Sequence, residues 1–170
     1  MSANGEINLA PYSFFNAVSD APPIVLFSSE GPKDSLVFVE QTKEFVCNLA
    51  TYDLRTAVVE TSAQFPRGVN EMEQSGLAPA PSRLVRPPRV AASPCALECK
   101  LLQVVRLHTL DGKPMDNYLS LGQVVGVHIN EAYLKDGLFD THAAQPIMRA
   151  GYRADYAEIG NMFEMFRPTA

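Results

Sequence analysis

The stretch ALECKLLQVVRLHTLDGKPMDNYLSLGQVVGVHIN, residues 96–130, predicts two long β-strands joined by a tight turn. Both halves carry many apolar and branched residues, which favour strands, and the Asp-Gly pair at 111–112 is typical of a hairpin. In the first half, apolar residues alternate with Glu98 and Lys100, so we expect these two side chains on a solvent-exposed face. Long hairpin strands together with a few helices favour a barrel or a sandwich with helices outside.

Further elements precede this hairpin. Two short apolar runs bounded by turn residues predict buried strands: PPIVLFSS (22–29) and EFVCNLA (44–50). Three helices are expected: over 51–63, over 70–76, and from a cap at Asp34 or Ser35. Asn70 is the expected cap of the helix over 70–76. The proline-rich segment 79–94 is expected to be a surface loop that braces a single domain, residues 1–170.

The composition excludes several classes of protein. Of the 170 residues, 46% are hydrophobic and 19% are charged, which indicates a globular chain. The formal net charge of -5 disfavours a general nucleic-acid binder, which needs a basic surface. No apolar run approaches the ~20 residues of a membrane span, and the first ten residues lack the pattern of a signal peptide. We therefore expect a cytoplasmic protein without nucleic-acid or membrane partners.

The thiol and imidazole groups follow no metal-binding spacing. The chain has three cysteines and three histidines: Cys47, Cys95, Cys99, His108, His128 and His142. None of them falls in a C-x-x-C or H-E-x-x-H pattern. An odd number of cysteines without an export signal also disfavours a disulfide framework. We expect buried or half-buried free thiols and no metal site.

The segment SSEGPKDS (28–35) combines groups that bind phosphate. Ser28, Ser29, Lys33 and Ser35 supply four side-chain donors, and the expected helix start supplies free backbone N–H groups and a favourable dipole. The spacing differs from that of a Walker A loop, which disfavours ATP as the ligand. The same residue types also form ordinary turns, so composition alone leaves both interpretations open.

Just upstream, PYSFF (11–15) places aromatic rings beside hydroxyl groups. Such a segment suits a flat heteroaromatic ligand with polar edges, and a ligand with a planar ring and a phosphate end would contact both segments. The aromatic residues could instead belong to the core. If 11–15 is a strand, Tyr12 and Phe14 share one face, and Ser13 and Phe15 share the other.

The stretch from residue 8 to residue 35 resembles the flavin reductase-like family, the FMN-binding split barrels. The likeness continues in further segments: 44–50, 61–73, 81–101, 122–129, 136–140 and 146–152. It implies a mainly β fold, a six-stranded antiparallel split barrel with a few peripheral helices, in a homodimer that binds FMN near the subunit interface. The implied activity is electron transfer from NAD(P)H to flavin, and the reduced flavin could serve a flavin-dependent oxygenase.

The resemblance also implies a cofactor site with two parts. The ring and ribityl chain would lie against four residues: Tyr12, Ser13, Phe14 and Phe15. The phosphate would lie among five others: Ser28, Ser29, Lys33, Asp34 and Ser35. Asp34 would cap the helix or orient Lys33 rather than contact the anion. No catalytic side chain is named, because flavin performs the electron transfer itself.

One departure from the family pattern concerns the start of the chain. Asn-Gly at 4–5 is a strong hairpin signal, and a strand is expected from Ile7 onward, yet only three residues precede the turn. We therefore expect the family's first barrel strand to lie upstream of Met1. A barrel without that strand would be open beside residues 11–15.

The sequence leaves other functions open. The chain could be a non-enzymatic FMN-binding flavoprotein or electron carrier, a haem-binding module, or a hydrolase or isomerase with His108 or His128 as base. Near the C-terminus, three residues could contact a nucleotide or a partner subunit: Arg149, Tyr152 and Arg153. The apolar segment NMFEMF (161–166) favours a homodimer, because such a chain end needs a covering surface.

Overall fold

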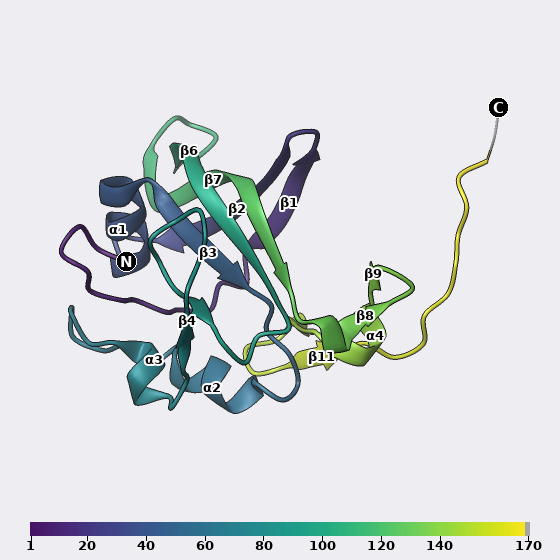
Figure 1. Ribbon diagram of the computed structural model, residues 1–170. Helices are drawn as coiled ribbons and strands as arrows, with labels where there is room; N and C mark the ends of the chain where they lie inside the picture. Colours follow the sequence, from purple (N-terminus) through teal and green to yellow (C-terminus); the bar gives the residue numbers. More distant parts are fainter. Residues whose placement is uncertain (169–170) are drawn as a thin grey trace.

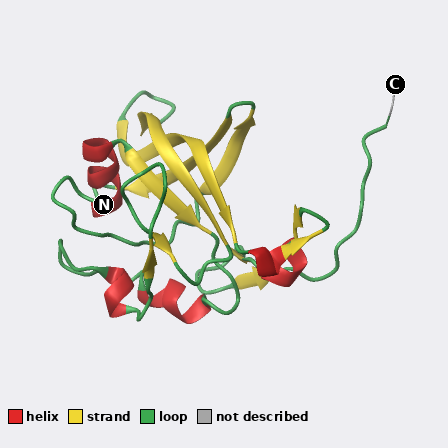
Figure 2. Cartoon of the chain, in the orientation of Figure 1, coloured by secondary structure: helices red, strands yellow, loops and turns green. Residues whose placement is uncertain are grey.

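A five-stranded antiparallel sheet forms the centre of the computed structural model, which describes residues 1–168 (Figure 1). The strands lie side by side in this order: β1 Phe15–Asp20, β2 Pro23–Glu30, β7 Pro114–Ile129, β6 Cys95–His108 and β3 Glu44–Asn48. The predicted mainly β fold is confirmed, and the described residues supply five strands to this sheet where six were expected. Short helices lie around the strands (Figure 2).

The helices and the smaller strands are brief. The helices are α1 Asp34–Thr42, α2 Arg55–Glu60, α3 Glu71–Gln74, η1 Glu131–Tyr133 and α4 Thr141–Ala144. The smaller strands pair as β4 Pro79–Ala80 with β5 Arg89–Val90, β8 Leu134–Lys135 with β9 Leu138–Phe139, and β10 Ile147–Arg149 with β11 Tyr156–Glu158. The predicted Asn70 cap is confirmed, because its side chain accepts the Met72 N–H at 3.1 Å.

The β6–β7 hairpin confirms the prediction made from residues 96–130. Gly112 turns the chain with a φ of 81°, and the Thr109 N–H donates to the Lys113 carbonyl across the turn at 2.9 Å. From this turn the two strands run the full height of the sheet and pair with β2 on one side and β3 on the other. The hairpin therefore carries the rest of the fold.

Glu98 is fully buried, so the expectation of a solvated side chain at this position is wrong, whereas Lys100 is exposed as expected. The cause is the proline-rich loop, which covers this part of β6. The Glu98 carboxylate accepts the three backbone N–H groups of residues 83–85 at 2.6–3.0 Å, and His128 Nε2 on β7 contacts the same carboxylate. The loop therefore braces the fold, as predicted, and the buried Glu98 side chain accepts three of the hydrogen bonds that hold it.

Residues 7–14 form an extended segment rather than the predicted strand, and β1 begins only at Phe15. Hydrogen bonds to the Glu71 carboxylate hold the first part of this segment against α3, and Phe14 at its end bonds to β2, through the Ser28 N–H. The Asn-Gly pair at 4–5 does form a turn, with a φ of 93° at the glycine, but no strand of the described chain flanks it.

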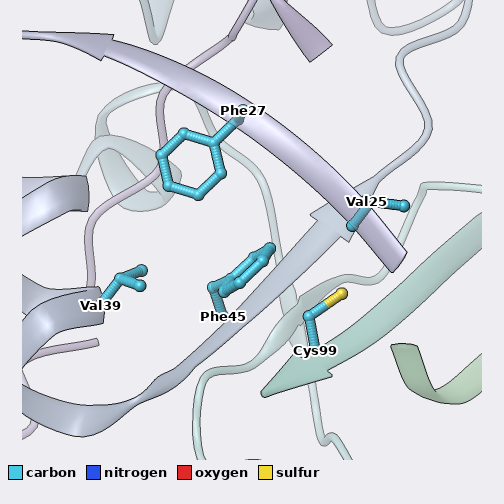
Figure 3. Close-up of a cluster of buried hydrophobic side chains, with 5 residues drawn as sticks. All are labelled: Val25, Phe27, Val39, Phe45 and Cys99. Carbon is cyan, nitrogen blue, oxygen red and sulfur yellow. The ribbon is translucent and has the colours of Figure 1, made fainter. Parts of the chain in front are cut away.

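The core lies where β2, β3, β6 and α1 meet (Figure 3). Five buried side chains form it: Val25, Phe27, Val39, Phe45 and Cys99. The Phe45 ring meets the Phe27 ring edge-on, with centroids 5.4 Å apart. It fits because Gly122 on β7 has no side chain: a Cβ there would lie 2.3 Å from the ring. The three cysteines are free thiols, buried or half-buried as predicted.

Two apolar parts of the described chain lie exposed. Residues 159–168 run away from the sheet (Figure 1), and four large side chains there are 62–85% exposed: Met162, Phe163, Met165 and Phe166. The edge strand β1 is exposed along most of its length. None of the helices within residues 1–168 is long and apolar enough to cross a membrane.

Candidate functional site

A cavity of about 430 Å³ lies beside the core, a volume typical of small-molecule sites. Several parts of the chain line it, among them residues 7–13, α1, residues 45–50, α2, Pro87, Pro88 and residues 147–149. Most of these side chains are apolar, and two of the core residues drawn in Figure 3, Phe27 and Phe45, also line the cavity. The cavity can therefore exclude water from the faces of a bound ring.

Two walls of the cavity offer backbone groups. β3 is an edge strand, and an edge strand presents unpaired N–H and C=O groups. On another wall, no hydrogen bond within residues 1–168 uses the backbone N–H of Ala10, Tyr12 or Ser13, all of which line the cavity. Backbone donors and acceptors on two walls suit a planar ligand with a polar edge.

The proline-rich loop supplies a further wall through Pro87, Pro88 and Val90. The Val90 N–H donates to the side-chain oxygen of Asn48 on β3 at 2.9 Å, which ties the loop to the neighbouring wall. Glu98 holds the other end of the loop. The shape of this wall therefore depends on two polar side chains, Asn48 and Glu98, which hold different parts of the loop.

A cluster of polar groups closes the end of the cavity nearest α1. Burial raises the pKa of the Tyr12 phenol, although the hydroxyls of Ser35 and Ser29 beside it offset part of the effect. The Ser35 hydroxyl donates to Asn8 Oδ1 at 2.5 Å, and the Asn8 amide donates to Glu71 at 2.9 Å. A phenol is neutral at pH 7 even at its ordinary pKa of about 10, so Tyr12 is a neutral hydrogen-bond donor here.

The start of α1 beside this cluster has no side-chain cap. Lys33 occupies the cap position, so the prediction of a cap at Asp34 or Ser35 is wrong. Asp34 instead pairs with Arg67 at 2.6 Å. No hydrogen bond within the described chain uses the backbone N–H groups of residues 34–36. Uncapped N–H groups at a helix start attract anions.

The structure brings four of the nine predicted cofactor residues to the cavity: Tyr12, Ser13, Phe15 and Ser35. The other five do not line it: Phe14, Ser28, Ser29, Lys33 and Asp34. Phe14 is 75% exposed, and Tyr12 packs inward on Phe27 with ring centroids 4.7 Å apart, so the two do not share a face as predicted. Ser29 is fully buried and donates to the Gly31 carbonyl at 3.0 Å.

Sequence reasoning missed three polar residues of the site: Asn8, Asn48 and Glu71. Asn8 and Glu71 lie 63 residues apart, so no local spacing could pair them. Arg149, singled out for a nucleotide or a partner subunit, lines the cavity with its guanidinium over the Tyr156 ring at 4.9 Å. Tyr152, predicted beside it, is 80% exposed and does not line the cavity.

The domain family described as flavin reductase-like matches residues 2–147 of this sequence. The chain belongs to the flavin reductase-like family. A relative from Deinococcus radiodurans, itself uncharacterised, is 35% identical over 170 residues, which span 95% of this chain and 72% of the relative. Membership agrees with the resemblance drawn from the sequence.

Solved structures agree with the fold. This member of the flavin reductase-like family is similar to nitrilotriacetate monooxygenase component B from Bacillus cereus, with a TM-score of 0.89 and 29% identity over 96% of this chain and 82% of that one. A protein with a split barrel domain from Shewanella frigidimarina gives a TM-score of 0.85 at 22% identity, over 99% of this chain and 82% of that one. The chain therefore has the split-barrel fold of its family.

Proposed function

We propose that this protein binds FMN and passes electrons from NADH or NADPH to flavin, as a cytoplasmic oxidoreductase. The observation that carries the proposal is the cavity, whose apolar walls, open backbone edges and uncapped α1 match the three parts of FMN. The ring would lie between residues 10–13 and β3, and the phosphate would meet the N–H groups at the start of α1. Membership of the flavin reductase-like family supports the same assignment.

The protein's own part in this chemistry is binding and orientation. Bound FMN supplies hydride and electron transfer. The apolar walls exclude water from the ring, Tyr12 offers a neutral hydroxyl donor, and Arg149 also lines the cavity. The similarity to a monooxygenase component B supports the further proposal that the reduced flavin serves a flavin-dependent oxygenase.

The deciding experiment is an absorption spectrum of the purified protein, followed by NADH and NADPH oxidation with and without added FMN. We expect a flavin spectrum after FMN addition and nucleotide oxidation that depends on flavin. Bound FMN without nucleotide oxidation would favour the electron carrier instead. A protein that binds no flavin at all would contradict the proposal.

Lys33→Ala should weaken FMN binding by roughly tenfold to a hundredfold, because it removes a cation beside the proposed phosphate position. Riboflavin lacks the phosphate, so its binding should change much less. Fluorescence titration of both flavins measures the two effects. Lys100, an exposed residue of β6, does not line the cavity, so Lys100→Ala should change the binding of neither flavin. Equal losses of FMN and riboflavin binding in Lys33→Ala would refute the phosphate assignment.

We expect the protein to be a homodimer in solution. The edge strand β1 and the apolar segment 161–166 are both exposed, and a monomer rarely leaves so much apolar surface uncovered. Light scattering at micromolar concentration measures the mass, and serine at Phe163 and Phe166 should shift it towards the monomer. A wild-type monomer that still binds FMN tightly would overturn the prediction.

A further inference from the structure

A chain of hydrogen bonds leads from a buried carboxylate to the cavity. Glu71, only 8% exposed, accepts the Leu9 N–H on Oε2 at 2.8 Å and the Asn8 side-chain amide on Oε1 at 2.9 Å. The other end of the Asn8 amide, Oδ1, accepts the Ser35 hydroxyl. Both Asn8 and Ser35 line the cavity, so the chain of hydrogen bonds ends there.

The chemistry of the three groups fixes the direction of this chain. A carboxylate only accepts hydrogen bonds, so Asn8 must turn its NH₂ group towards Glu71. Its oxygen then faces Ser35, and a serine hydroxyl has a single hydrogen to give. Ser35 donates that hydrogen to Asn8 Oδ1. What remains on Ser35 Oγ is acceptor capacity alone, which is available to the cavity and to the Tyr12 hydroxyl beside it.

We propose that Ser35 is an acceptor subsite for a neutral hydroxyl group of the ligand, and that Glu71 is the positioning residue that makes it one. The proposal rests on the proposed function, in which the ligand is a flavin and the hydroxyl belongs to its ribityl chain. Phosphate oxygens carry lone pairs and negative charge, so Ser35 Oγ in this state repels them. The phosphate is held by the backbone N–H groups at the start of α1, and Ser35 selects the part of the ligand next to it.

Glu71→Gln should reverse the chain without removing volume. The Leu9 N–H needs the oxygen of the substituted side chain as its acceptor, which leaves the new NH₂ group facing Asn8. Two NH₂ groups cannot bond to each other, so the Asn8 amide rotates and presents its NH₂ group to Ser35. Ser35 then accepts from Asn8 and points its own hydrogen into the cavity, where a donor replaces an acceptor.

The first test compares FMN with riboflavin, both of which carry the ribityl chain. Ser35→Ala should weaken both by a similar factor, roughly three- to tenfold, as measured by fluorescence titration. A loss for FMN at least ten times larger than the loss for riboflavin would overturn the proposal, since Ser35 would then hold the phosphate. Wild-type protein that binds neither flavin would overturn the proposed function and the ribityl subsite together.

The second test needs no flavin. In ¹⁵N NMR spectra of the protein, the Asn8 side-chain NH₂ protons should show contacts to Glu71 in the wild type and to the Ser35 methylene in Glu71→Gln. Glu73→Gln, on the exposed face of the same helix α3, should leave the Asn8 signals unchanged. In the wild type, contacts from the Asn8 NH₂ protons to Ser35 would show that the hydrogen bonds run in the opposite direction. That result would overturn the role of Glu71 regardless of the flavin-binding results.

Discussion

Glu98→Ala is expected to lower the free energy of unfolding by about 3–5 kcal/mol, because it removes a fully buried carboxylate and leaves several buried donors without an acceptor. The variant leaves the N–H groups of residues 83–85 and the His128 ring without their shared acceptor. For a chain of this size the melting temperature should fall by about 6–20 °C. Thermal unfolding followed by circular dichroism measures the effect.

Two further variants separate the causes. Glu44 accepts one N–H from the same loop, that of Arg86 at 3.0 Å, but its side chain is 19% exposed, so Glu44→Ala should cost only about 1 kcal/mol. Glu98→Gln keeps the volume and loses the charge, and its stability should lie between those of the wild type and Glu98→Ala. Equal effects of Glu44→Ala and Glu98→Ala would contradict the role given to the buried carboxylate.

The same carboxylate predicts how stability depends on pH. Burial alone would raise the pKa of Glu98, but hydrogen bonds from His128 and from the loop N–H groups outweigh it and lower the pKa to about 2. A carboxyl group whose pKa is lower in the folded state stabilises the fold fully above its unfolded pKa of about 4.3. The stability gap between wild type and Glu98→Gln should therefore narrow as pH falls from about 4.3 towards 2.

The elements predicted well are those that local chemistry determines. Asp111-Gly112 forms the hairpin turn, and Asn70 caps α3, because each depends on residues within one turn of the chain. The prediction of a solvent-exposed Glu98 was wrong because alternating apolar and polar residues predict a strand with one face in water. Here a loop 13 residues earlier in the sequence covers that face. Residues 7–14 resemble a strand in composition, but no strand of the described chain pairs with residues 7–13, and the Glu71 carboxylate holds the Leu9 N–H and the Asn8 side chain instead.

In the candidate site, too, local sequence predicts some features, and contacts between distant segments determine the rest. Of the aromatic and hydroxyl residues in 11–15, three line the cavity: Tyr12, Ser13 and Phe15. The pattern of residues 28–35 indicated a helix start near a ligand, but sequence could not tell which hydroxyls face the cavity. Ser29 is fully buried, and the Ser35 hydroxyl donates its hydrogen to Asn8. Contacts between distant segments decide which of several suitable side chains a ligand can reach.

Gly122→Ala is expected to destabilise the fold by about 3 kcal/mol, the upper part of the range for an overfilled core. The added Cβ would lie 2.3 Å from the Phe45 ring and 3.3 Å from the Cys99 Cβ, and the ring is only 7% exposed. The ring has to move, and its open side is the cavity, which it lines. FMN binding should therefore weaken together with stability, and urea unfolding and flavin titration measure the two effects.

A second substitution tests whether contact with the Phe45 ring causes the destabilisation by Gly122→Ala. Phe45→Leu alone should cost roughly 1 kcal/mol or more through the space it leaves, yet combined with Gly122→Ala the smaller side chain makes room for the new methyl group. The double variant should then be more stable than the sum of the two single effects by about 1 kcal/mol or more. Gly126→Ala in the same strand is the control, because its Cβ meets no atom closer than 3.3 Å and the nearest is the end of the exposed Leu84 side chain. If Gly126→Ala cost as much as Gly122→Ala, both glycines would matter to β7 as a strand, and the space occupied by Phe45 would not be the reason.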